Sequence, residues 1–120
     1  LILLAEDNEA NLATLSNYLE LQGYRMAIAR TGCEAVDAVM QEPPDLILMD
    51  IQMPEMDGLE AMRQIRQMPA QAHVPIIALT ALAMPGDRQR CAEAGATNYV
   101  AKPVKMRQLR EMIYTLLSKD

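Results

Sequence analysis

The sequence has no tryptophan or phenylalanine, and only two cysteines among its 120 residues. Cys33 and Cys91 stand far apart, with no CxxC pair, which favours free thiols in a reducing cytoplasm over a disulfide. Ten methionines are the simplest filler for a core that lacks the larger aromatic residues. A chain of this length can bury one core without disulfide or metal cross-links. We therefore expect a single domain, residues 1–120. Because it opens inside an apolar run without an initiator methionine, we also expect a longer parent polypeptide.

Long hydrophobic runs and an excess of basic residues are missing too. No apolar stretch approaches the ~20 residues that span a bilayer, and no basic segment followed by an apolar stretch indicates a signal peptide. The 11 Lys and Arg are outnumbered by 16 Asp and Glu, giving a formal net charge of -5. Phosphate backbones are bound by basic faces. We therefore expect no direct contact with nucleic acid and no membrane contact by this domain.

Short apolar runs alternate with helical patterns along the whole chain. Strands are predicted at residues 1–5, 24–29, 46–49, 74–79 and 98–101. Helices are predicted from Asn8 to Gly23, from Thr31 to Pro43, from Gly58 to Met68, from Pro85 to Gly95, and over about 104–117. Five strands alternating with five helices indicate an α/β fold with a parallel sheet, helices on both faces and right-handed crossovers.

The third apolar run leads directly to Asp50 and to a loop bounded by Pro54 and Gly58. Four consecutive large apolar residues are typical of a strand buried on both faces. An open α/β sheet places its chemistry at the carboxyl ends of such strands. Taken alone, Asp50 could equally cap the turn that follows it. The residues at the other strand ends decide between these interpretations.

Polar residues also follow three other predicted strands: Glu6-Asp7, Thr80 and Lys102. Taken singly, each has an ordinary explanation: Glu6-Asp7 could form a solvated turn, Thr80 could simply end its strand, and Lys102 could be a surface residue. Together they lie at one edge, where crowded carboxylates need a cation among them or retained protons. A hard divalent ion, Mg²⁺ before Ca²⁺, fits oxygen donors of this kind. Carboxylates, a hydroxyl and a lysine in one place match phosphoryl transfer to a carboxylate.

Five segments carry a family resemblance that covers the whole chain. They are Glu6-Asp7-Asn8, the stretch 49–58 with sequence MDIQMPEMDG, Leu79-Thr80-Ala81, Ala94-Gly95-Ala96, and the stretch 99–103 with sequence YVAKP. In these segments the chain resembles the receiver domain of two-component response regulators. The resemblance implies a flavodoxin-like, doubly wound five-stranded parallel sheet with strand order 2-1-3-4-5.

The same resemblance implies the roles of the acidic residues. Asp50 would accept a phosphoryl group from a phosphohistidine, and the domain would catalyse its own phosphorylation and dephosphorylation. Mg²⁺ would be held by Asp7, Asp50 and the backbone carbonyl of Gln52, with Glu6 assisting through water.

The remaining roles belong to the fourth and fifth strand ends. The resemblance implies that Lys102 and Thr80 contact the phosphoryl oxygens and that Thr80 and Tyr99 form the switch. The Lys102-Pro103 peptide bond is expected to be cis, a form that is accessible mainly before proline.

A histidine kinase or a histidine phosphotransfer domain is the implied partner. Because this partner must reach Asp50, we expect it to dock on the first helix and on the loop that follows the fifth strand. The expected contacts are Ala10, Asn11, Thr14, Pro103 and Val104. The isolated domain is expected to be a monomer.

Finer motifs narrow the subfamily. The segments AEDN at 5–8 and ALTALAM at 78–84 resemble receivers of hybrid sensor histidine kinases, which exchange phosphate with phosphotransfer domains. Receivers of DNA-binding regulators usually have an acidic pair before the switch aromatic and Phe after Lys-Pro; here those places hold Thr97-Asn98 and Val104. A DNA-binding regulator and a stand-alone receiver remain the alternatives.

Two other protein classes place comparable residues at a strand end. A dehalogenase-type phosphatase normally has a second Asp two residues after the first, where this chain has Gln52. A flavin or nucleotide binder needs a phosphate-cradling loop after the first strand, but residues 6–9 are acidic and lack glycine.

Overall fold

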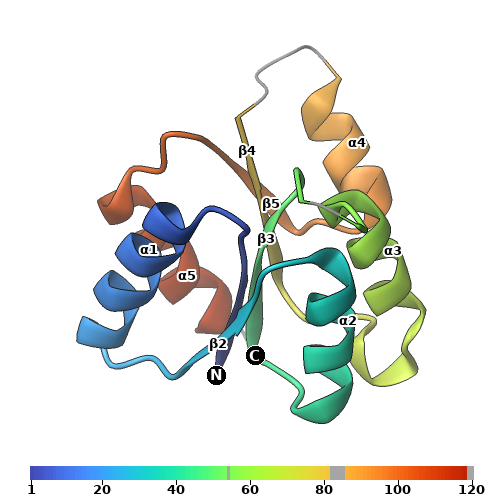
Figure 1. The fold of residues 1–120 in the computed structure, drawn as a ribbon, viewed down its shortest axis with the longest axis horizontal. Coiled ribbons are helices and arrows are strands. Elements are labelled where there is room, and N and C mark those ends of the chain that lie inside the picture. The colour runs from blue at the N-terminus through green and yellow to red at the C-terminus, as the bar shows by residue number, and fades with distance from the viewer. Residues whose placement is uncertain (54, 82–85, 119–120) are drawn as a thin grey trace.

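The computed structural model describes residues 1–53, 55–81 and 86–118 (Figure 1). The described residues form one sheet of five parallel strands in the order β2-β1-β3-β4-β5. The strands are β1 (Ile2–Ala5), β2 (Met26–Ala29), β3 (Leu46–Asp50), β4 (Ile76–Thr80) and β5 (Asn98–Ala101). The flavodoxin-like topology predicted from the sequence is confirmed.

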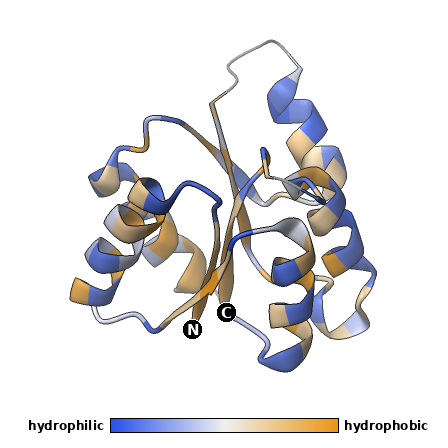
Figure 2. Cartoon of the chain, in the orientation of Figure 1, coloured by the Kyte–Doolittle hydropathy of each residue, from blue (hydrophilic) through white to orange (hydrophobic). Residues whose placement is uncertain are grey.

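Helices cover both faces of this sheet. They are α1 (Glu9–Leu21), α2 (Gly32–Gln41), α3 (Gly58–Gln67), α4 (Asp87–Ala94) and α5 (Met106–Leu117), with a short 3₁₀ helix, η1 (Pro69–Gln71), after α3. Figure 1 shows α1 and α5 on one side and α2, α3 and α4 on the other. Figure 2 shows the predominantly hydrophobic strands between these layers and the more hydrophilic outer surfaces of the helices.

Alternation along the strands separates the core into two halves. Leu3 and Ile47 pack toward α2 and α3, whereas Ile2 and Leu4 pack toward α1 and α5. Successive side chains of a strand point to opposite faces, and in this sheet both faces are covered. β1, β3 and β4 are accordingly buried along their whole length.

The predicted helix boundaries have clear local causes. The N-cap side chains of Asn8, Thr31 and Asp57 each accept the backbone N–H of the residue three positions on, at 3.1, 3.0 and 2.9 Å. Gly23 follows α1 with φ +98°, and Gly95 ends α4 with φ +120°. Both glycines adopt left-handed backbone conformations that other residues seldom take.

Several predicted boundaries differ from the structure by about two residues. β2 begins at Met26 because the Tyr24 N–H still donates to Leu19 O at the end of α1, at 3.2 Å. β4 begins at Ile76, directly after Pro75, which has no N–H to donate. α5 begins at Met106 rather than at residue 104. Pro85, the predicted start of the fourth helix, lies outside the described residues.

Candidate functional site

Lys102 lies between two buried carboxylates at the carboxyl edge of the sheet. Its Nζ donates hydrogen bonds to Asp50 Oδ2 at 2.9 Å and to Glu6 Oε2 at 3.1 Å. The carboxylate side chains are 2% and 0% exposed, respectively, and that of Lys102 is 19% exposed. Glu6, Asp50 and Lys102 each lie two positions after a core residue that faces α1 and α5. These core residues are Leu4, Leu48 and Val100, respectively. Alternation therefore brings all three to one face of the sheet.

Lys102, Asp50 and Glu6 form a bridge of one ammonium group and two carboxylates, and the charges of this bridge shift the pKa values of Glu6 and Lys102. Burial raises the pKa of Glu6, and the negative charge of Asp50 raises it further, against the opposing hydrogen bond from Lys102. Burial alone would lower the pKa of Lys102, but its hydrogen bonds to Asp50 and Glu6 outweigh burial and raise it. The lysine is therefore held as an ammonium ion between the two carboxylates.

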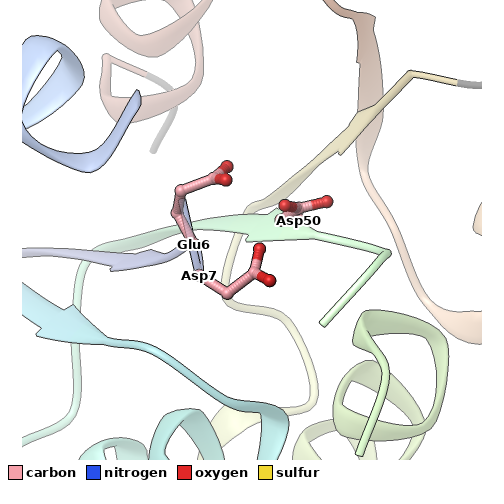
Figure 3. A group of neighbouring side chains, drawn as sticks. All are labelled: Glu6, Asp7 and Asp50. Carbon is pink, nitrogen blue, oxygen red and sulfur yellow. The ribbon is translucent and has the colours of Figure 1, made fainter. Parts of the chain in front are cut away.

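Asp7 adds a third carboxylate from the end of β1. One oxygen each of Glu6, Asp7 and Asp50 lies within 4.8 Å of the other two, and Figure 3 shows the Glu6 and Asp7 side chains turned toward the end of β3 that carries Asp50. Asp7 is exposed, whereas both carboxylate oxygens of Glu6 already accept from Lys102. Hard divalent cations bind oxygen donors, so this acidic cluster fits Mg²⁺.

The loop after β3 is held at its beginning by main-chain hydrogen bonds. The Gln52 N–H donates to Asp50 Oδ1 at 3.0 Å, and the Ile51 N–H donates to Leu79 O at 3.1 Å. The Gly58 N–H closes the loop on Ile51 O at 3.2 Å. Pro54, which was expected to bound this loop, lies outside the described residues. The orientation of the Asp50 carboxylate is thus fixed from both sides, by Gln52 on Oδ1 and by Lys102 on Oδ2.

Thr80 and Tyr99 lie on neighbouring strands, with Thr80 at the carboxyl edge opposite Ala101 and Tyr99 further back, opposite Ala78. Thr80 is fully buried at the end of β4, and its carbonyl accepts the Lys102 N–H at 2.7 Å. Tyr99 is half-buried and packs against the part of the core that faces α2 and α3. Thr80 follows Ala78, a residue of this part of the core, by two positions, so its side chain belongs to the same face of the sheet. The guanidinium carbon of Arg88 lies 5.5 Å from the centroid of the Tyr99 ring, a cation–π contact. The cis form of the Lys102-Pro103 peptide bond is confirmed.

Four of the five residues expected to contact a partner line a hollow that Glu6 and Lys102 also line. Ala10, Asn11 and Thr14 are exposed on α1, Pro103 is exposed, and Val104 is half-buried. The hollow has a volume of about 170 Å³, and its lining residues are Glu6, Asn11, Thr14, Leu15, Lys102, Pro103, Val104 and Met106. Ala10 does not line this hollow. The other four expected residues are brought together beside the carboxylate cluster.

Two features were missed in the sequence, one at the site and one at the opposite edge of the sheet. One is the bridge from Lys102 to Glu6, which the strand alternation of both residues could have indicated. The other is Arg66, whose guanidinium donates to Gly95 O at 2.9 Å, Gln71 O at 3.1 Å and Thr97 Oγ1 at 3.3 Å. It ties the end of α3 to the start of β5. Its carbonyl partners belong to backbone turns, so no residue pattern signals them.

Fold and site together define a flavodoxin-like α/β domain with a carboxylate-centred site at the carboxyl ends of its strands. The chain belongs to the response regulator receiver domain family, which it matches over residues 2–114. It is therefore the phosphoacceptor domain of a two-component system, a class that interacts with histidine kinases or phosphotransfer proteins. Family membership also sets aside the phosphatase and the nucleotide binder.

Individual relatives match almost the whole chain. The polar-differentiation response regulator DivK of Brucella ovis is 39% identical over 116 residues, covering 97% of this chain and 94% of DivK. The receiver domain of the sensor histidine kinase PA1611 from Pseudomonas aeruginosa PAO1 is 40% identical, with a TM-score of 0.92 over 98% of this chain and 97% of that one. That structure has a magnesium ion coordinated in its active-site cleft.

A second kinase receiver gives a similar match. The signal receiver domain of a signal transduction histidine kinase from Syntrophus aciditrophicus is 38% identical, with a TM-score of 0.90 over 98% of this chain and 89% of that one. The resemblance to kinase receivers is thus supported by two solved structures. Within the described residues, no helix has the length and apolar character needed to cross a membrane.

Proposed function

We propose that Asp50 is the phosphoacceptor and that it takes a phosphoryl group from a phosphohistidine in an Mg²⁺-dependent reaction. The observation that carries this proposal is the placement of Asp50 at the end of a buried strand, bonded to Lys102 and close to Asp7. A carboxylate positioned in this way can act as a nucleophile while a neighbouring cation offsets the charge of the incoming group.

Asp7, Asp50 and the backbone carbonyl of Gln52 are the proposed metal ligands, with Glu6 assisting through water. The all-oxygen donor set and the mutual approach of the carboxylates support this assignment. Glu6 is suited to an indirect role because it already accepts from Lys102 and from the Asn8 N–H, the latter at 3.2 Å. When bound, the ion offsets negative charge on the carboxylates and on the transferred phosphoryl oxygens.

In the proposed step, a carboxylate oxygen of Asp50 forms a bond to phosphorus while the bond from phosphorus to the donor imidazole nitrogen breaks. The electron pair of that bond stays with the imidazole. Lys102 donates to a phosphoryl oxygen, for which it must exchange part of its present bonding to Asp50 and Glu6. The Thr80 hydroxyl donates to a second oxygen. These donors lower the barrier by stabilising charge on the transferred group.

Thr80 and Tyr99 are the proposed switch. Both side chains belong to the same face of adjacent strands. A displacement of Thr80 toward the phosphoryl oxygens vacates space toward β5, which Tyr99 can enter by changing its χ1 rotamer. The surface made by α4 and β5 changes as a result.

The parent protein is proposed to be a hybrid sensor histidine kinase working in a phosphorelay. The two kinase receivers at 40% and 38% identity support this context. A stand-alone receiver is the second candidate, because the matched segment covers 94% of DivK. The phosphotransfer partner is proposed to dock over the hollow between α1 and the Pro103-Val104 loop, where Asn11 and Thr14 border the approach to the bridge.

The test is incubation with acetyl phosphate and Mg²⁺, followed by intact-protein mass spectrometry. The wild-type protein should gain one phosphoryl group that hydroxylamine removes, as expected for an acyl phosphate, and Asp50→Asn should gain none. Asp57→Asn is the matched control, because Asp57 lies in the same loop and Asn also serves as an N-cap. Phosphorylation of Asp50→Asn to the wild-type extent would refute the assignment.

A further inference from the structure

The first residue of α2 contacts the loop that follows Asp50. The first N–H groups of a helix have no partner within the helix. At α2, the Thr31 side chain accepts from the Glu34 N–H, whereas the Gly32 N–H donates to Met56 O at 3.0 Å. A helix donor is thus satisfied by a carbonyl of the loop between β3 and α3.

This contact requires glycine for reasons of space. A Cβ on Gly32 would lie 2.1 Å from Met56 O and 2.8 Å from the Met56 carbonyl carbon, far inside normal contact distance. The φ angle of Gly32 is not in the left-handed region, in contrast to Gly23 and Gly86, which have open space around them. The missing side chain therefore serves the close approach of the two backbones.

The loop that contains Met56 is anchored on β3 at the site. Its far end folds back on β3, since a Cβ on Gly58 would lie 2.2 Å from Asp50 O. Within the loop, directly before Met56, Glu55 has φ +69°, a left-handed conformation that is unfavourable for a residue with a side chain. The Gly32 hydrogen bond holds the residue directly after Glu55 and so helps to maintain this conformation. The same loop contains Gln52, bonded to Asp50 Oδ1.

We propose that Gly32 is a positioning residue for the phosphoacceptor loop. Its bare Cα and its N–H hold the Met56 carbonyl, and this contact keeps the Gln52 backbone in place to bind Mg²⁺ beside Asp50. The inference rests on the proposed function, in which the Gln52 carbonyl is a metal ligand. It assigns to the start of α2, which carries none of the proposed site residues, an influence on metal affinity.

The variant that tests this role is Gly32→Ala. Helix propensity alone would make alanine favourable at this position. The clash with Met56 should instead displace the loop and weaken Mg²⁺ binding about tenfold, the usual scale for the loss of a residue that orients metal ligands. The readout is isothermal titration calorimetry with Mg²⁺ alone, which does not depend on phosphorylation.

Val39→Ala is the matched control for general destabilisation. Val39 is a buried residue of the same helix and belongs to the core facing α2 and α3. This variant should lose thermal stability yet bind Mg²⁺ as the wild type does. Wild-type Mg²⁺ affinity in folded Gly32→Ala would overturn the proposal, as would an equal loss of affinity in Val39→Ala.

A measurement on the wild-type protein covers the case in which Gly32→Ala does not fold. Amide hydrogen exchange at Gly32, followed by NMR, should slow at saturating Mg²⁺, because a metal that fixes the loop also stabilises the bond to Met56 O. Unchanged exchange at Gly32 while Mg²⁺ binds would overturn the positioning role. Neither result alters the Asp50→Asn test, so failure of the inference is distinguishable from failure of the proposed function.

Discussion

Lys102 Nζ lies 2.9 Å from Asp50 Oδ2, although the two residues are 52 positions apart in the chain. The same ammonium group also bonds Glu6, so one cation serves two buried carboxylates. Removing the lysine from this cluster would leave both carboxylates uncompensated, which generally costs more than the intact cluster contributes. The folded state and the proposed phosphoryl chemistry therefore depend on one side chain.

Lys102→Met should lower both stability and reactivity. The variant leaves Glu6 and Asp50 buried without their cation, so the free energy of unfolding should fall by about 1–3 kcal/mol at pH 7. Phosphorylation by acetyl phosphate should also slow, because a donor to the phosphoryl oxygens is lost. Urea unfolding in the presence of a chelator measures the first effect, and time-resolved mass spectrometry measures the second.

Lys105→Met is the control for this substitution. Lys105 is exposed and is the N-cap residue of α5, where its side chain makes no capping hydrogen bond. Its replacement should leave both quantities close to the wild-type values. If Lys102→Met were as stable as Lys105→Met, the bridge would not be a stabilising feature of the metal-free protein.

Glu6→Gln should stabilise the metal-free protein at neutral pH. Burial and the charge of Asp50 raise the pKa of Glu6, so the folded state holds this proton more tightly than the unfolded chain does. The stability that Glu6 contributes is complete below its ordinary pKa of 4.5 and is lost as pH rises through the raised value. Glutamine cannot ionise. At pH 7 the free energy of unfolding of the variant should therefore be higher than that of the wild type by on the order of 1 kcal/mol.

The pH dependence separates this cause from general packing effects. The advantage of Glu6→Gln, measured by urea unfolding, should shrink as pH falls from 7 toward 4. Glu9→Gln should give no gain at pH 7, because the hydrogen bond from Arg30 lowers the pKa of Glu9. An advantage of Glu6→Gln that stayed constant or grew on acidification would contradict the electrostatic explanation.

The sequence predicted the site's location because parallel strands bring their carboxyl ends together. Glu6-Asp7, Asp50, Thr80 and Lys102 each end or follow a strand, and the shared direction of parallel strands suffices to place them at one edge. The roles assigned to these residues by family resemblance remain predictions.

Contacts made to backbone atoms could not be predicted in this way. The bond from Gly32 to Met56 O depends on how two loops approach, and a glycine at the start of a helix does not by itself indicate a close neighbour. Arg66 is likewise satisfied by the carbonyls of Gly95 and Gln71, and any residue can supply a carbonyl. Such contacts are determined by tertiary structure, which local residue patterns do not specify.

Asp7→Asn should reduce the stabilisation that Mg²⁺ provides. A ligand that binds only the folded state raises its stability in proportion to the logarithm of its concentration above Kd. With one carboxylate fewer, the rise in Tm on adding Mg²⁺ should be much smaller than in the wild type. Differential scanning calorimetry with and without the ion measures this rise. Asp37→Asn, which removes an exposed acid of α2, should retain the full effect, and an undiminished rise in Asp7→Asn would exclude Asp7 as a ligand.

Asn11→Glu should slow phosphoryl transfer from a phosphohistidine protein without changing phosphorylation by acetyl phosphate. Asn11 is exposed on α1 and lines the hollow beside the bridge. A new charge there should therefore act on a partner docked over the hollow rather than on the reaction at Asp50. The position is the third residue after the N-cap Asn8, where glutamate is favourable to the helix. Loss of α1 is therefore not the expected cause of slower transfer.

Asn17→Glu provides the comparison, since Asn17 is exposed on the same helix but does not line the hollow. It adds the same charge and should leave transfer from both donors at the wild-type rate. If Asn11→Glu slowed both donors equally, its effect would lie in the carboxylate site rather than in docking. Equal slowing of protein-to-protein transfer by both variants would indicate a general charge effect, because the added charge then acts wherever it stands on α1. Selective slowing by Asn11→Glu alone would locate the partner over the hollow, within reach of Asp50.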